Sequence, residues 1–230
     1  MKKIGLIGGM SWESSKVYYE IINEKVRELL GGFHSAKCIL ESVDFSEIER
    51  LQHINDWDSL NKLMVEASKN LENAKADVII LCTNTMHLCS EDIIKNTKIP
   101  FLHIAAETGK KIKEKHISKV LLLGTKFTME SDFFKKILLD DFGIEVIIPS
   151  ATDRDTVHNI IYKELVHGKI LESAKKDYIK IINKAVNQGA QGVILGCTEI
   201  PLLIKDKDVN IAVFDTTRIH AESAVAYALK

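Results

Sequence analysis

The chain has little of what marks a protein that binds nucleic acid or crosses a membrane. Its 31 Lys and Arg residues nearly balance 32 Asp and Glu residues, so charge favours neither nucleic acid nor an anionic membrane as a partner. No apolar run approaches the roughly 20 residues that span a bilayer. The first residues show no apolar segment followed by a cleavage site, so we expect no signal peptide and a cytoplasmic location.

Metal and nucleotide signatures are also missing. The four cysteines show no paired spacing typical of metal ligands, and we expect reduced thiols. They are Cys38, Cys82, Cys89 and Cys197. Gly8 and Gly9 follow the first apolar run without G-x-G-x-x-G spacing, and no G-x-x-x-x-G-K-[ST] loop occurs. We therefore expect no metal, no nucleotide and no other cofactor.

What the sequence does contain is a series of short apolar runs that alternate with amphipathic segments. This order predicts an α/β fold with parallel sheets. The predicted strands are 3–8, 37–43, 77–82, 100–103, 119–124, 144–148, 191–196 and 211–214. The predicted helices are 13–30, 58–74, 104–115, 129–142, 154–167, 171–188 and 216–229.

The two halves of the chain repeat this pattern. Ile4–Met10 resembles Val120–Lys126, and a second strand end follows each at nearly the same interval, near Thr83 and near Cys197. The repeat predicts two similar α/β domains related by a pseudo-two-fold axis, with the active site in the cleft between them.

The domain boundaries follow from the breaks between predicted elements. Pro100 precedes a new strand, so residues 100–208 are assigned to the second domain. The last strand and the terminal helix are expected to return to the first domain, which then comprises residues 1–99 and 209–230.

Two short stretches carry most of the chemical information. Leu81–His87 and Gly196–Glu199 each follow an apolar run that reads as a buried parallel strand. Ligands bind at the carboxyl ends of strands in open α/β sheets. Two such ends facing each other would hold one small substrate between two proton-transfer groups.

Cys197 is the strongest single candidate for catalysis. Gly196 before it permits close backbone approach, and Thr198 after it is suited to capping a helix. Amides at a helix start would stabilise a thiolate. A buried structural cysteine is an equally good interpretation of its position alone.

Thr83, Asn84 and Thr85 form the second candidate group. Taken alone they are better explained as a helix cap and turn. Strand alternation predicts that Cys82 and Thr83 point to opposite faces, so both cannot contact one substrate. His87 would cap, orient or donate a proton, or be a structural histidine.

Further candidates lie at the other strand ends. The turn after the first strand is expected to present the amides of Met10 and Ser11 to a small anion. Thr125 holds the related place in the second half. Arg50 and Gln52 would reach a substrate carboxylate, although a solvated helix face explains them at least as well.

Six short motifs make the chain similar to the aspartate/glutamate racemase superfamily over essentially its whole length. They are Gly8–Trp12, Ser42–Phe45, Thr83–His87, Leu123–Thr125, Gly196–Glu199 and Phe214–Thr216. The resemblance implies two α/β domains, a homodimer, and racemisation without pyridoxal phosphate, with two opposed cysteines as base and acid. The Gly-Cys-Thr-Glu motif alone also suits related isomerases and decarboxylases.

The chain departs from the family pattern at the first of these cysteines. The usual motif is Cys-Asn-Thr-x-His, but here Thr83 directly precedes Asn84 and Thr85. By this resemblance Thr83 maps to the first catalytic cysteine and Cys197 to the second. The chain thus resembles a bacterial subgroup that pairs Thr with Cys and acts on L-aspartate and L-glutamate.

The sequence therefore predicts a cofactor-independent racemase of aspartate, glutamate or both. Cys197 is the predicted base for the L-enantiomer, and Thr83 is the donor or relay on the opposite face. The predicted substrate-binding residues are Met10, Ser11, Gln52, Asn84, Thr85, Thr125, Thr198 and Glu199. The alternatives are a related enzyme, such as a maleate isomerase, hydantoin racemase or malonate decarboxylase, and a non-catalytic amino-acid sensor.

Overall fold

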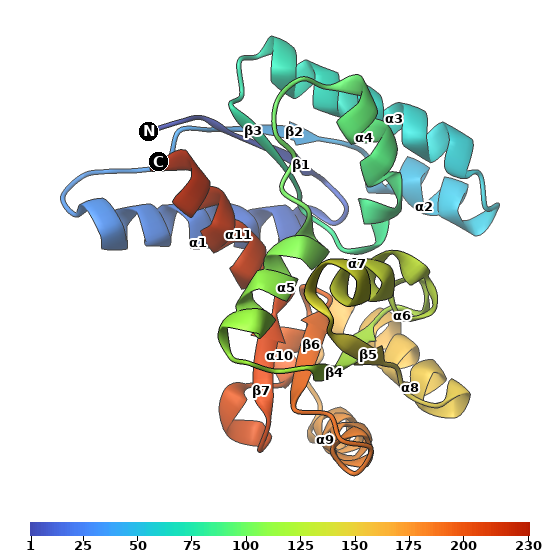
Figure 1. The fold of residues 1–230 in the computed structure, drawn as a ribbon. Coiled ribbons are helices and arrows are strands. Elements are labelled where there is room, and N and C mark those ends of the chain that lie inside the picture. The colour runs from blue at the N-terminus through green and yellow to red at the C-terminus, as the bar shows by residue number, and fades with distance from the viewer. The chain divides into compact units, whose positions relative to one another are not determined.

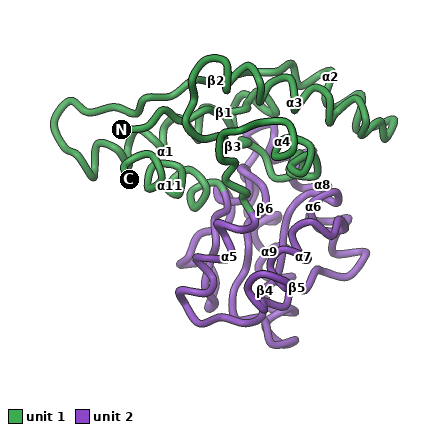
Figure 2. The backbone as a smooth tube through the Cα atoms, turned by 45° about the horizontal axis from the view of Figure 1, so that its top comes forward, with its two compact units in different colours: residues 1–104, 217–230 green, residues 105–216 purple.

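The computed structural model describes residues 1–230 and divides into two compact units (Figures 1 and 2). Unit 1 comprises residues 1–104 and 217–230, and unit 2 comprises residues 105–216. The chain therefore passes from unit 1 into unit 2 and back again. Each unit is α/β and contains a parallel sheet, which confirms the predicted fold class.

Unit 1 is built on a three-stranded sheet in the order β2-β1-β3. Its strands are β1 (Ile4–Gly8), β2 (Cys38–Ser42) and β3 (Val78–Leu81). Its helices are α1 (Trp12–Leu30), α2 (Phe45–His53), α3 (Trp57–Asn73), the 3-10 helix η1 (Thr85–Cys89) and α4 (Ser90–Asn96). Helices α5 (Ile104–Glu114) and α11 (Thr216–Ala228) begin where the chain crosses between the units.

Helices cover both faces of the unit 1 sheet. Ile79 and Leu81 of β3 pack with α2, α3 and α4, whereas Val78, Ile80 and Cys82 pack with α1 and α11. Strands buried on both faces are apolar throughout, and this is why β1 and β3 read as continuous hydrophobic runs.

Unit 2 contains a four-stranded sheet in the order β5-β4-β6-β7, so the order of the first sheet recurs as β5-β4-β6. Its strands are β4 (Lys119–Gly124), β5 (Glu145–Ile147), β6 (Gly192–Gly196) and β7 (Ala212–Asp215). Its further helices are α6 (Lys126–Glu130), α7 (Asp132–Phe142), α8 (Ala151–Lys163), η2 (Leu165–His167), α9 (Glu172–Val186), α10 (Ile200–Leu203) and η3 (Asp206–Asp208). Helices α8 and α9 bury one face of this sheet.

Two segments belong to a different unit from the one predicted. The segment around Phe101 joins β3 in unit 1, because Ile79 N donates to Pro100 O at 2.8 Å and Leu102 N donates to Ile79 O at 3.0 Å. Strand β7 pairs in parallel with β6 in unit 2, so only α11 returns to unit 1. An apolar run identifies a strand but does not identify its neighbour in the sheet.

The helices differ from the prediction mainly where they are short. The predicted helix 129–142 is interrupted at Ser131, whose extended backbone (φ −70°, ψ 152°) separates α6 from α7. The predicted helix 154–167 ends as the 3-10 helix η2. Helices α2, α4 and α10 lie outside the predicted helix ranges.

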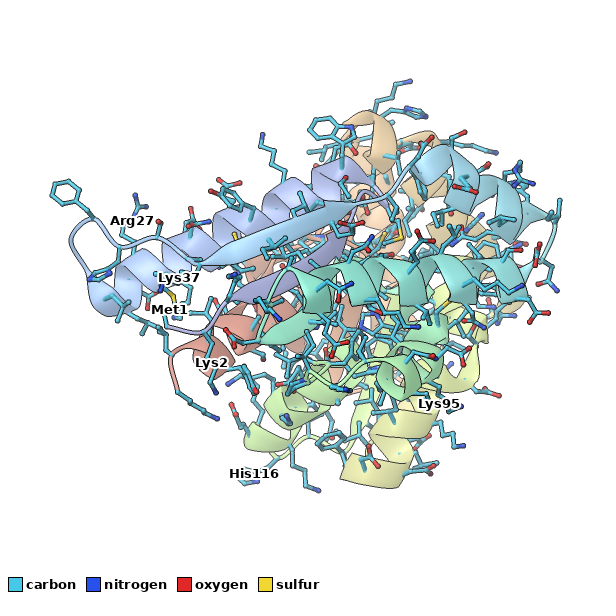
Figure 3. All side chains as sticks on the ribbon, turned by 90° about the horizontal axis from the view of Figure 1, so that it is seen from above. Met1, Lys2, Arg27, Lys37, Lys95 and His116 are labelled. Carbon is cyan, nitrogen blue, oxygen red and sulfur yellow. The ribbon has the colours of Figure 1, made fainter.

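Charged side chains are exposed along the outer surfaces, as Figure 3 shows for Lys2, Arg27 and Lys95. None of the helices combines the length and the apolar character that crossing a membrane requires.

Gly9 is a position at which the backbone itself requires glycine. It has φ +92°, and a Cβ there would overlap the carbonyl oxygen of Val43. We expect Gly9→Ala to lower the free energy of unfolding by roughly 2–4 kcal/mol, from the left-handed backbone and the clash together. Gly143→Ala is the matched control, because Gly143 has φ +64° but no atom within 4 Å of a built Cβ. Urea titrations that give equal losses for the two variants would contradict the clash.

Candidate active site

Cys197 lies directly after β6, at the carboxyl end of the unit 2 sheet. Gly196 pairs with Gly124 of β4, and a Cβ on Gly196 would lie 2.9 Å from the carbonyl oxygen of Leu123. The hydroxyl of Thr216 donates to the carbonyl oxygen of Leu195 at 2.9 Å and ties the end of β7 to β6. Cys197 is partly buried and is attached to a tightly packed sheet edge.

The thiol of Cys197 is hydrogen-bonded to a carboxylate. Its Sγ donates to Oε2 of Glu199 at 2.8 Å. Burial and, next, the Glu199 carboxylate raise the pKa of Cys197 well above that of a free thiol, and the amides of Thr198 and Glu199 offset this only in part. The thiol is thus neutral in the resting protein.

This result corrects the expectation that a helix start lowers the pKa of Cys197. The next helix, α10, has only four residues. Its N-cap is Glu199 rather than Thr198, and the Glu199 side chain bonds the sulfur instead of capping the helix. Glu199 was predicted to bind the substrate, but in the structure its carboxylate accepts the hydrogen bond of the Cys197 thiol.

Thr125 follows β4 at the same edge of the sheet. It is the N-cap of α6, and its Oγ1 accepts from Thr128 N at 3.3 Å. His158 of α8 accepts from Lys126 N at 3.3 Å and fixes the first residue of α6. Thr125, Cys197, Thr198 and Glu199 thus gather at one edge of unit 2.

The unit 1 candidates gather at the carboxyl ends of β1 and β3. Thr83 is partly exposed, whereas Cys82 is fully buried in the core beneath α1 and α11. Burial raises the pKa of Cys82 far above the value of a free thiol. Cys82 thus belongs to the core of unit 1, whereas Thr83 is accessible to solvent.

The residues after Thr83 do not act as the predicted side-chain cap. Asn84 holds the N-cap position of η1, but its side chain makes no capping hydrogen bond. It is buried, and Thr85 is partly exposed. Gln52 reaches this loop from α2 and donates through Nε2 to Sδ of Met86 at 3.1 Å, whereas Arg50 is exposed.

A serine that the sequence analysis missed holds the turn after β1. The Ser15 hydroxyl accepts from Gly9 N at 2.8 Å and donates to the carbonyl oxygen of Ser11 at 3.2 Å. Met10 is buried in this turn and Ser11 is partly exposed. Met10, Ser11, Gln52, Thr83, Asn84 and Thr85 therefore share one region of unit 1.

His87 is a structural residue rather than a proton relay. It is fully buried, its Nδ1 donates to the carbonyl oxygen of Thr83 at 2.7 Å, and its Nε2 accepts from Ile104 N at 3.2 Å. Both ring nitrogens are engaged, so the suggestion that His87 donates a proton is wrong. Its contribution is to hold the backbone at Thr83.

Two further histidines pack around His87, and no sequence motif pointed to them. The His103 ring lies 4.7 Å from that of His87, and the His220 ring lies 5.6 Å from it. Tyr18 donates to Nδ1 of His220 at 2.9 Å, and Nε2 of His220 donates to the carbonyl oxygen of Leu102 at 2.8 Å. No three His, Cys, Asp or Glu side chains are arranged as metal ligands.

Burial keeps these histidines neutral. It lowers the pKa of His103 and of His220 to about 4 and that of His87 well below 6.5, and the proximity of the rings adds to the effect for His87.

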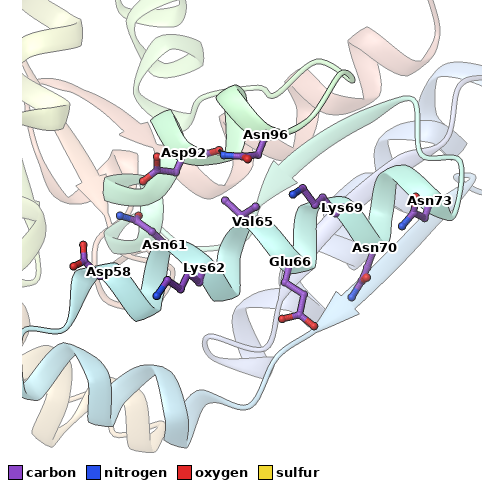
Figure 4. Close-up of a pocket in the computed structure, with 10 residues that line it drawn as sticks. All are labelled: Asp58, Asn61, Lys62, Val65, Glu66, Lys69, Asn70, Asn73, Asp92 and Asn96. Carbon is purple, nitrogen blue, oxygen red and sulfur yellow. Dashed lines mark hydrogen bonds between the residues drawn. The ribbon is translucent and has the colours of Figure 1, made fainter.

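A surface groove of about 760 Å³ runs along α3 and α4 (Figure 4). Its lining mixes basic Lys62 and Lys69 with acidic Asp58 and Asp92, and Val65 is its one apolar residue. It contains none of the candidate catalytic or substrate-binding residues.

Comparison with known proteins identifies the family of this chain. The sequence profile of the Asp/Glu/Hydantoin racemase family matches residues 7–224. The chain belongs to the Asp/Glu/Hydantoin racemase family. It is therefore an isomerase, and its fold is the two-domain α/β fold of racemases.

Individual relatives support the same assignment. A candidate Asp/Glu racemase from Yersinia pestis, known from its crystal structure, is 51% identical over 100% of both chains, with a TM-score of 0.96. An aspartate racemase homologue from Pyrococcus horikoshii is 36% identical over 100% of both chains, with a TM-score of 0.89. A broad-specificity amino-acid racemase of Bacillus subtilis is 24% identical over 178 residues, which are 74% of this chain and 73% of that protein.

Because these histidines are neutral in the folded state, we expect this racemase to lose stability in mild acid. The unfolded chain protonates each histidine below about pH 6.5, whereas the folded chain does so only near pH 4. Stability is therefore fully present above pH 6.5 and falls by about 2 kcal/mol per neutral histidine between pH 7.5 and 5. Urea titrations at the two pH values measure this. His34→Gln, at an exposed site, should leave the loss unchanged, and an equal free energy at both pH values would refute the assignment.

Proposed function

We propose that this racemase interconverts the enantiomers of aspartate, of glutamate or of both, without pyridoxal phosphate. Family membership supports amino-acid racemisation. The observation that carries the proposed mechanism is the Cys197 thiol at the end of β6, hydrogen-bonded to a carboxylate. Cys197 would remove the α-proton of the L-enantiomer, and Thr83 would serve the opposite face of the same carbon.

Removal of the α-proton leaves negative charge on the substrate, and preorganised donors stabilise such charge most effectively. The side chains of Asn84, Thr85, Thr125 and Thr198 and the amides of Met10 and Ser11 are proposed to supply these donors. Gln52 would join them by leaving the sulfur of Met86, which is a weak hydrogen-bond acceptor and costs little to release.

The two faces are chemically unequal. A threonine hydroxyl is a poor base at neutral pH, and His87 is not available to assist because both of its nitrogens are engaged. Proton transfer on the Thr83 face would therefore pass through water.

The direct test incubates the purified protein with L-aspartate or L-glutamate and separates the enantiomers by chiral chromatography. Formation of the D-enantiomer after treatment with a chelator and a carbonyl reagent that removes pyridoxal phosphate is the expected result. Racemisation of a hydantoin alone would identify a hydantoin racemase instead. A thermal shift with L-aspartate but no exchange of its α-proton would identify a sensor.

The two unit-specific cysteines should respond differently to substitution. Cys197→Ala is expected to abolish racemisation with little change in stability, because the thiol stands at a partly exposed strand end. Cys82→Ala is expected to retain activity and to lower the free energy of unfolding by about 1–2 kcal/mol, because it removes a buried sulfur. A folded Cys82→Ala protein as inactive as Cys197→Ala would show that the assignment of Thr83 is wrong.

The inequality of the two faces should be visible in deuterated water. L-aspartate is expected to exchange its α-proton faster than D-aspartate forms, because reprotonation at the Thr83 face is the slower step. Mass spectrometry of recovered L-aspartate at early times measures this exchange. Thr83→Cys should narrow the difference, since a thiol with a pKa of about 8.5 transfers protons more readily than a hydroxyl. Exchange no faster than racemisation in the unsubstituted protein would exclude slow reprotonation there.

A further inference from the structure

The carboxylate of Glu199 stands where the proton of Cys197 must go before the sulfur can act as a base. The S···O separation is 2.8 Å, and both groups are partly buried in unit 2. Tyr178 of α9 lies within electrostatic reach of both groups, but its hydroxyl donates to the carbonyl oxygen of Val157 at 3.2 Å. Glu199 is thus the group that accepts the hydrogen bond of the Cys197 thiol.

We propose that Glu199 is a positioning residue that accepts the Cys197 proton and thereby generates the thiolate, a role that rests on the proposed racemisation. The S–H bond breaks, its electron pair stays on sulfur, and an O–H bond forms on Glu199. The thiolate then takes the α-proton of the L-substrate, so that an S–H bond re-forms and the Cα–H electron pair passes into the substrate carboxylate. A water molecule donates a proton to the opposite face of the carbon and becomes hydroxide, and the proton of Glu199 neutralises that hydroxide as the product leaves.

The physical advantage of this route is constant charge. The pair carries one negative charge whether the proton is on sulfur or on oxygen. Loss of the thiol proton directly to water would instead place a second negative charge beside Glu199 in a partly buried site, which is unfavourable. Transfer within the pair also makes the supply of thiolate nearly independent of pH wherever Glu199 begins as a carboxylate.

Glu199→Gln tests the proposal because it removes the acceptor and leaves the burial that raises the thiol pKa most. Its kcat for L-aspartate should fall at least about 100-fold at pH 7, the usual contribution of a general base, and recover about tenfold per pH unit on going to higher pH. The unsubstituted protein and Glu199→Asp should show a nearly flat kcat between pH 6.5 and 8.5.

The rate of Cys197 alkylation by iodoacetamide measures the supply of thiolate without substrate turnover. Peptide mass spectrometry locates the alkylated cysteine. In Glu199→Gln the rate of alkylation should be lower at pH 6.5 and should rise with pH. In the unsubstituted protein the rate should be nearly independent of pH. Cys38, a partly exposed thiol on β2, is the internal control and should respond to pH equally in all variants. If the unsubstituted protein proves inactive on amino acids, the proposed function fails, and the alkylation profile still decides the role of Glu199.

Glu164→Gln is the matched control for charge. Glu164 also reaches Tyr178 electrostatically, and its buried Oε2 has no hydrogen-bond partner. The Glu164→Gln substitution should leave the rate of Cys197 alkylation nearly independent of pH. A steep profile in Glu164→Gln as well would show a general charge effect and overturn the proposal. Faster alkylation of Glu199→Gln at every pH would overturn it too, because Glu199 would then only suppress the thiolate.

Discussion

Burial of the central strands on both faces is the constraint on which the rest of this structure depends. In unit 1 the residues of β3 alternate between two helix layers, so neither face offers room for a solvated polar group. A polar side chain within such a strand would lose its water without compensation. Reactive side chains can therefore lie only beyond the ends of the buried strands. Thr83 lies two residues beyond β3, and Cys197 directly follows β6.

Both candidate residues follow the end of a buried strand, but the two strand ends differ in their chemistry. In unit 2 a thiol donates a hydrogen bond to a carboxylate at 2.8 Å, so this edge carries an acid–base pair. In unit 1 a neutral imidazole is fixed between the carbonyl oxygen of Thr83 and the amide of Ile104, so the edge is rigid and uncharged. A fold that repeats its topology thus supplies two distinct chemical environments, and the difference resides in side chains rather than in the backbone.

Sequence reasoning succeeded where the determinants are local. Apolar runs located the main strands, including β3 and β6, whose ends carry the candidate residues. It failed where a residue's partner is distant or oriented by packing. The neighbour of β7 is decided by pairing across the sheet, and Tyr18 meets His220 across 202 positions of sequence. The raised pKa of Cys197 depends first on burial and then on the orientation of the Glu199 side chain, and no spacing rule encodes either.

The return of α11 has a consequence for the order in which the protein is made. Unit 2 is continuous in the chain, but unit 1 is completed by residues 217–230, which the ribosome adds after all of unit 2. Until then the sheet face that packs with α1 lacks Ala224 and Val225, and the histidine cluster lacks His220. Domains generally fold as units during synthesis, in the order in which they emerge. In this chain the unit that emerges first is the one that is completed last, because the face that α11 covers lacks that helix until unit 2 has been synthesised.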